Sequence, residues 1–134
     1  MAPQTRVIVL VTTRNGYVLL HRDQLPQATV PNHGDLALTG RLTLARQTGH
    51  LADITHAWTV RSIGPDNDGE LWILNGGVHD TVPDATEDTH PRTRWAPITT
   101  LTENTEPTAA IQEALDAIDA GISIRLPAAS LSGG

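Results

Sequence analysis

The stretch Leu38-Thr39-Gly40-Arg41-Leu42-Thr43-Leu44-Ala45-Arg46-Gln47-Thr48-Gly49-His50 decides how the rest of the chain is organised. It is predicted to form one short helix, because three apolar residues recur at helical spacing: Leu38, Leu42 and Ala45. Thr39 is a suitable N-cap, and Gly49 stands where a left-handed C-cap residue belongs. The sequence before this helix is typical of a hairpin, and the sequence after it is typical of a sheet and one closing helix.

The polar face of the predicted helix carries Thr43, Arg46 and Gln47, and no acidic residue lies between positions 36 and 52. These three side chains are therefore candidates for binding a ligand. A guanidinium at Arg46 could form a forked pair of hydrogen bonds with a phosphate or a carboxylate. The alternative is an ordinary surface arginine that pairs with a nearby acid such as Asp53 or Asp35.

Upstream of the helix, residues 7–13 are apolar and mostly β-branched, which predicts a buried strand. The dipeptide Asn15-Gly16 is a strong hairpin signal, because both turn positions favour a positive φ. Residues 17–22 then form the returning strand. Residues 24–36 are rich in turn formers and are predicted to be a loop.

Downstream of the helix, the pattern predicts a hairpin of two strands, residues 53–63 and 70–78, joined by a loop at 64–69. The pair Gly76-Gly77 indicates a bulge or a close approach of the backbone. An acidic, proline-punctuated loop follows at 79–92, then a short strand at 93–98. The clearest helix spans 107–120.

This order of elements predicts an α/β fold, in the form of a sandwich. The length of 134 residues indicates one domain, which we place at residues 1–121, followed by a flexible tail at 122–134. Exposed sheet edges would allow a homodimer.

Composition excludes several classes of function. A net charge of −6 argues against nucleic acid as a partner, because phosphate binding needs clustered positive charge. No apolar run approaches the length of a membrane span. Without cysteine or lysine, the described chemistry cannot use thiolate ligands, a lysine Schiff base or a P-loop lysine. We expect a cytoplasmic protein with no cofactor and with a small-molecule ligand or substrate.

Three segments resemble the Nudix hydrolases. The strand Val18-Leu19-Leu20-His21-Arg22 is similar to the second strand of that family, and residues 44–50 resemble the end of its signature helix. Residues 94–98, followed by Leu101, resemble its late strand. The resemblance implies an α/β/α sandwich with a mixed β-sheet, one short central helix and one C-terminal helix.

The resemblance fails at the residues that carry the chemistry of the family. With Gly49 as the anchor, the Arg-Glu pair of the signature falls on Leu42 and Thr43, and its Glu-Glu pair falls on Arg46 and Gln47. In the family these glutamates bind divalent cations, which polarise a diphosphate and generate hydroxide. Because Arg46 would repel Mg²⁺, the sequence predicts no metal site and the loss of metal-dependent pyrophosphohydrolase chemistry.

Three residues are candidates for acid–base catalysis: His33, Asp35 and His50. His33 and Asp35 are close in sequence, so the carboxylate could orient the imidazole and raise its basicity. An ordinary turn explains the same pair. His50 lies at the end of the helix, where the helix dipole alone would also explain an imidazole.

The remaining candidates would bind the ligand. Arg22 ends a strand and could meet an anionic group, although an exposed strand-end arginine explains it equally well. Trp58 and Trp72 lie on paired strands and could form an apolar wall for a ring, or simply belong to the core. Glu87 lies where some Nudix proteins place a loop glutamate, within a loop whose acids otherwise indicate a solvated face.

The sequence therefore leads to one main hypothesis and two alternatives. The main hypothesis is a repurposed, metal-independent enzyme that performs acid–base chemistry on a small, anionic or biosynthetic metabolite. The first alternative is a non-catalytic module that binds a nucleotide or another small molecule. The second is residual hydrolysis of a diphosphate-containing substrate.

Overall fold

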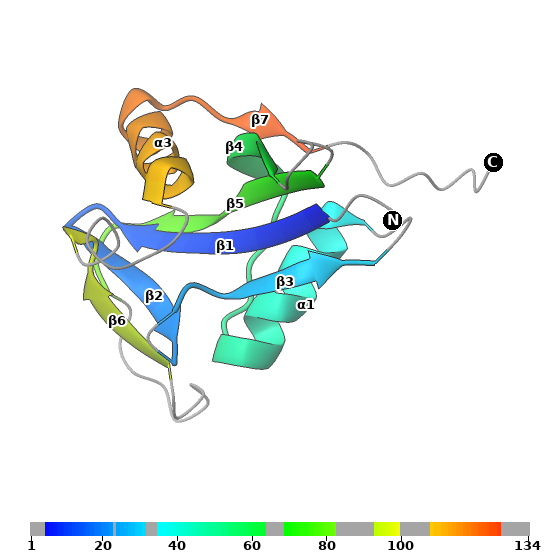
Figure 1. Ribbon diagram of the computed structural model, residues 1–134. Coiled ribbons are helices and arrows are strands. Elements are labelled where there is room, and N and C mark those ends of the chain that lie inside the picture. Colours follow the sequence, from blue (N-terminus) through cyan, green and yellow to red (C-terminus); the bar gives the residue numbers. More distant parts are fainter. Residues whose placement is uncertain are drawn as a thin grey trace.

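The computed structural model describes residues 5–22, 24–31, 35–63, 69–82, 93–99 and 108–126 (Figure 1). The elements in chain order are β1 (Thr5–Thr13), β2 (Tyr17–His21), β3 (Gln27–Val30), α1 (Leu36–Thr48), β4 (His56–Ile63), β5 (Gly69–His79), β6 (Thr93–Pro97), α3 (Thr108–Ala120) and β7 (Ile124–Arg125). Within these residues no helix is long and apolar enough to cross a membrane.

The strands form one mixed sheet in the order β6-β2-β1-β5-β4-β7, with β3 paired to β1. The central pair, β1 and β5, is parallel, whereas β2 and β3 run antiparallel to β1. The parallel pair explains why the two central strands are the most continuous apolar segments of the chain, since both of their faces are covered.

Side chains alternate along β1 and supply two separate cores. Val7, Val9 and Val11 pack on one face of the sheet, in the cluster that contains Leu44 of α1. Ile8 and Leu10 pack on the other face with residues of α3, including Ala110, Ile111 and Ala114. The two helices therefore cover opposite faces of the sheet (Figure 1), and the predicted α/β/α sandwich is confirmed.

Helix α1 lies on the sheet with a different face from the predicted one. Its buried residues are Gly40, Thr43, Leu44 and Thr48, whereas Leu38 and Leu42 are 51% and 41% exposed. Gly40 allows this contact, because a Cβ there would lie 2.5 Å from Cδ1 of Leu74. The hydroxyl of Thr48 donates to the carbonyl of Leu44 at 2.7 Å, so it can be buried without an unsatisfied group.

The caps of α1 confirm one prediction and correct the other. Gly49 is the C-cap in the left-handed region with φ 74°, as predicted. The N-cap is Asp35 rather than Thr39: the Asp35 carboxylate accepts from the backbone N–H groups of Ala37 and Leu38 at 2.9 and 3.2 Å. An acid at this position also opposes the positive end of the helix dipole.

Two strands were not predicted. Residues 27–30 were expected to be a loop, but they form β3 against the start of β1. Residues 122–126 were expected to belong to a flexible tail, but β7 pairs with β4, and Leu126 is only 7% exposed. The folded unit therefore extends past the predicted boundary at Gly121, and residues 127–134 lie outside the described part of the chain.

A bulge in β4 corrects the predicted tryptophan wall. Ala57 pairs with Leu74 while Thr59 pairs with Ile73, so an extra residue is accommodated at Trp58. Trp58 consequently packs with the core beneath α3, whereas Trp72 packs with the core beneath α1. The two indole rings lie on opposite faces of the sheet and cannot form one wall.

Candidate functional site

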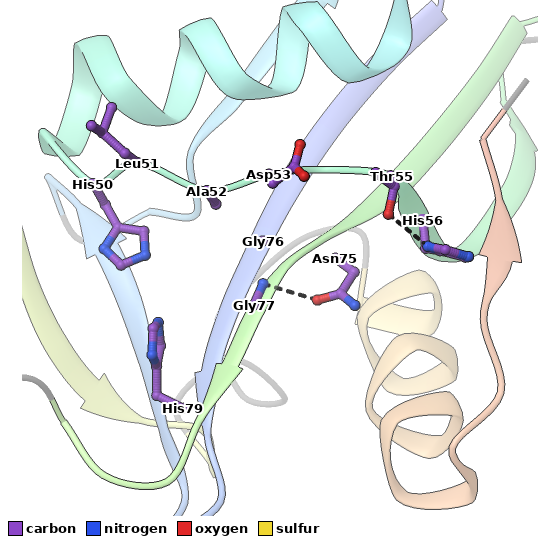
Figure 2. A pocket seen from close by; sticks show the side chains of 10 residues that line it. All are labelled: His50, Leu51, Ala52, Asp53, Thr55, His56, Asn75, Gly76, Gly77 and His79. Atoms are coloured by element: carbon purple, nitrogen blue, oxygen red, sulfur yellow. Dashed lines mark hydrogen bonds between the residues drawn. The ribbon is translucent and has the colours of Figure 1, made fainter. Parts of the chain in front are cut away.

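A cavity of about 250 Å³ lies between the segment that follows α1 and the second half of β5 (Figure 2). Ten residues line it: His50, Leu51, Ala52, Asp53, Thr55, His56, Asn75, Gly76, Gly77 and His79. Three of the six histidines of the chain are among them, so this cavity is where the titratable chemistry gathers.

A bulge in β5 shapes one wall of the cavity and confirms the prediction made for the glycine pair. Leu10 pairs with Asn75 and Thr12 pairs with Val78, so Gly76 and Gly77 together oppose one residue of β1. Gly77 adopts a φ of +122°, which is strained for any other residue. The Asn75 side-chain oxygen accepts from the Gly77 N–H at 2.9 Å and holds the bulge in place.

Gly76 has a different role in the same bulge. A Cβ at Gly76 would lie 2.6 Å from Cγ2 of Val11 and 2.8 Å from Cγ1 of Val9. The backbone of β5 can therefore approach β1 this closely only because position 76 has no side chain. Together the two glycines set the direction in which the strand leaves the sheet.

The bulge aims His79 at His50, which lies 29 positions earlier in the chain. Their ring centroids are 5.3 Å apart, and the ring planes are at 89°. The indole of Trp95 is also close to His79, at a centroid distance of 6.2 Å and an angle of 84°. Figure 2 shows the two imidazoles pointing toward one another across the cavity.

The environment of this imidazole pair favours the neutral form of His50. Burial lowers the pKa of His50 below its ordinary value of 6.5, and the charge of a protonated His79 would lower it further. The Nε2 atom of His79 is buried and has no hydrogen-bond partner among the described residues. A buried nitrogen of this kind is costly unless a bound group satisfies it.

The other end of the cavity is polar and lacks a free cation. The hydroxyl of Thr55 lies 2.8 Å from Nδ1 of His56. The Asp53 carboxylate is paired with the Arg41 guanidinium at 2.8 Å, and Arg41 also donates to the carbonyl of Ile54 at 3.2 Å. Within the described ranges, no group of three or more His, Asp or Glu side chains could hold a metal ion.

Of the residues predicted to be functional, only His50 lines this cavity. Thr43 is buried against the sheet, and the Gln47 side chain donates to the carbonyl of Gln27 at 3.3 Å. Arg46 is exposed on α1. The arginine that pairs with Asp53 is Arg41 rather than Arg46.

The other predicted residues are placed elsewhere or lie outside the description. Asp35 caps α1, so its carboxylate already has a structural role. Arg22 is exposed in the turn after β2, with a φ of 53°. Trp58 and Trp72 are separated by the sheet. His33 and Glu87 lie outside the described residues.

Sequence reasoning missed His79 and Asn75 as partners of His50. The available signal was the glycine pair itself, because a bulge redirects the side chains that follow it and His79 is two residues beyond Gly77. The contact between β5 and the segment after α1 has no local sequence signal. His56 was assigned to the wrong face, because a strict alternation was assumed through the β4 bulge.

Comparison with known proteins shows a match in structure. No family model matches the sequence, and no curated protein sequence matches it. The MutT protein from Methanosarcina mazei superposes with a TM-score of 0.60 at 16% identity, over 90% of this chain and 96% of that chain. A Nudix hydrolase from Nitrosomonas europaea gives a TM-score of 0.63 at 15% identity, over 94% and 93%.

A third match is the Nudix domain of Shewanella oneidensis NrtR, solved in complex with ADP ribose. Its TM-score is 0.62 at 14% identity, and the match covers 88% of each chain. This chain has the Nudix fold. Within that fold, Thr43, Arg46 and Gln47 occupy the positions at which the signature helix of the family carries glutamates, and the imidazole pair lies just beyond the end of the same helix.

Proposed function

We propose that this Nudix-fold protein is a metal-independent enzyme in which His50 exchanges a proton with a small molecule bound in the cavity. The observation that carries the proposal is the pair of facing imidazoles, His50 and His79, at 5.3 Å on the cavity wall. The residues that replace the family's glutamates on α1 cannot bind a hard cation, whereas an imidazole can serve as acid or base near neutral pH.

The two histidines have different roles in this proposal. His50 is held largely neutral near pH 7, because its pKa is lowered by burial and by His79, so it is available to accept a proton. His79 lies behind it, aimed by the bulge at Gly77 and flanked by Trp95. His79 is therefore a positioning residue that sets the orientation and the acidity of His50.

The experiment begins with thermal stability of the whole chain against nucleotides, sugar nucleotides and acyl metabolites, with Mg²⁺ and with EDTA. Compounds that raise Tm are then incubated with the protein in D₂O and EDTA and followed by proton NMR. Turnover or deuterium exchange is expected for the wild type and a loss of at least tenfold for His50→Asn. Arg46→Gln is the matched control, because Arg46 lies outside the cavity, and this variant is expected to retain the wild-type rate.

Two outcomes would reject the proposal. A stabilisation that requires Mg²⁺, with turnover abolished by EDTA, would favour residual hydrolysis of a diphosphate. Turnover that survives in His50→Asn would remove His50 from the chemistry.

A second candidate is a non-catalytic module that binds a nucleotide-like molecule. The structural match to a Nudix domain solved with ADP ribose favours it, since it shows the fold in the role of a ligand-binding domain. Calorimetric titration with ADP ribose tests this candidate. Binding without turnover, weakened by Arg46→Gln and unchanged in His50→Asn, would support the module and contradict the enzyme.

A further inference from the structure

We infer that the cavity takes an uncharged carbonyl compound, whose oxygen accepts a hydrogen bond from the side-chain amide of Asn75. The inference rests on the proposed function, because it names the class of molecule on which His50 would act. It differs from the diphosphates that the resemblance to Nudix hydrolases implies.

The first argument is the fixed orientation of the Asn75 side chain. Its oxygen must face Gly77, because the backbone N–H of Gly77 is a donor and the contact is 2.9 Å. The amide nitrogen therefore points away from Gly77 (Figure 2), and it has no hydrogen-bond partner among the described residues. A donor that is held by the bulge and lines the cavity is pre-organised to meet an acceptor on a ligand.

The second argument is the charge of the cavity wall. None of its ten lining residues is an arginine or a lysine, and Asp53 contributes a carboxylate at the rim. The nearby guanidinium of Arg41 is already bonded to Asp53 and to the carbonyl of Ile54. A phosphate or diphosphate would lose its hydration without gaining a cation, which is unfavourable.

The third argument is size. A volume of about 250 Å³ corresponds to about eight water molecules at ~30 Å³ each. A compound with one small ring fills that space, whereas a dinucleotide does not. An amide donor beside an imidazole in such a space matches a neutral molecule with one carbonyl group and an adjacent C–H bond.

This arrangement also gives His50 a chemical step. When an imidazole nitrogen of His50 removes a proton from the carbon next to the carbonyl, the C–H electron pair becomes a C=C bond and the carbonyl π pair moves to oxygen. The product is an enolate and an imidazolium, and the N–H of Asn75 stabilises the charge on the oxygen. Return of the proton to either carbon or oxygen restores neutral His50.

The test compares three small compounds by ¹⁵N-resolved NMR of the full chain: cyclohexanone, cyclohexanecarboxylate and inorganic pyrophosphate. Cyclohexanone is expected to shift the side-chain amide of Asn75 and the imidazoles of His50 and His79. Pyrophosphate at the same concentration is expected to leave these signals unchanged. This comparison uses the wild type alone, so it does not depend on how any variant folds.

Two variants separate hydrogen-bond donation from the structural role of Asn75. Asn75→Asp keeps an oxygen for the Gly77 N–H but loses the donor, so cyclohexanone is expected to bind about tenfold more weakly while the Gly77 amide signal stays in place. Asn75→Ala loses both groups and is expected to move the Gly77 signal as well.

Preferential binding of pyrophosphate or the carboxylate, or equal binding of cyclohexanone by Asn75→Asp, would overturn the inference. The proposed function fails differently. If cyclohexanone binds through Asn75 but turnover of a substrate is unaffected in His50→Asn, the ligand class stands and the proton transfer is rejected.

Discussion

At the scale of single residues, His50 links the cavity to the stability of the fold. Its pKa is lowered in the folded state, so the unfolded chain binds more protons than the folded chain around and below pH 6.5. The contribution of neutral His50 to stability is therefore present at higher pH. It is lost as the pH falls from the unfolded pKa toward the lower folded pKa.

We expect His50→Asn to flatten this part of the pH profile. The measurement is the free energy of unfolding by urea at pH 5, 6, 7 and 8 for the wild type and the variant. The difference between the two proteins isolates His50 from the other histidines. An identical slope in both proteins between pH 5 and 7 would show that the environment of His50 does not favour its neutral form.

Gly77 is the residue on which the direction of His79 depends. Gly77→Ala is expected to lower the free energy of unfolding by about 1–3 kcal/mol, because φ +122° is strained for alanine. The added methyl group would also lie 3.7 Å from Nε2 of His79. Urea unfolding measures the first effect, and the imidazole NMR signals of His79 report the second.

Gly16→Ala is the matched control for this prediction. Gly16 also has a positive φ, +94°, but a Cβ there would meet nothing within 4 Å, and it lies in the β1–β2 turn. It should lose stability from backbone strain without moving the signals of His79. If both variants moved those signals equally, the bulge would not be what aims the imidazole.

At the scale of elements, α1 shows what sequence patterns could and could not predict. The position of the helix, its glycine C-cap and its place before the long hairpin were all predicted from local signals. Its buried face was not, because small residues such as Gly40 and Thr48 carry that face while Leu38 and Leu42 point outward. Periodicity follows hydrophobicity, whereas here close approach of the backbone decides the contact.

The orientation of α1 makes opposite predictions for two neighbouring positions. Gly40→Ala is expected to destabilise the fold by about 1–3 kcal/mol, because the new Cβ would lie 2.5 Å from Leu74 and 3.3 Å from Ile54. Alanine's better helix propensity, worth about 1 kcal/mol, offsets part of this loss. Leu42→Ala should change stability by no more than about 0.5 kcal/mol, since Leu42 is largely exposed.

Chemical denaturation of both variants measures this contrast. The face expected from the sequence would bury Leu42, so its truncation would then cost about 2–5 kcal/mol. A large loss in Leu42→Ala with little change in Gly40→Ala would therefore restore the predicted orientation of the helix.

At the scale of the whole molecule, the sequence identified the sandwich but not the place where its elements meet. His50 was a candidate on its own, yet the residues that complete its surroundings come from β5. They are brought to it by the parallel pairing of β1 with β5, which leaves no trace in local composition. Short strands were missed for a related reason. Two residues of β7 are too few to show an alternation, and only pairing with β4 defines them.

The extent of the folded unit can be tested at β7, which also supports the far end of the cavity. The backbone N–H of Leu126 donates to the carbonyl of Thr55 at 3.0 Å, and both Thr55 and His56 line the cavity. Leu126→Ala is expected to lower the free energy of unfolding by about 2–3 kcal/mol, because a side chain in the core beneath α1 is removed. It should also shift the imidazole signals of His56.

Ile122→Ala is the control for this last step, because Ile122 is 63% exposed and should change stability by less than about 0.5 kcal/mol. Urea unfolding and NMR of the same samples give both readouts. If Leu126→Ala behaved like Ile122→Ala, the fold would end at Gly121, as the sequence alone suggested, and the cavity would need no support from β7. A selective loss at Leu126 instead makes the last described strand part of both the fold and the site.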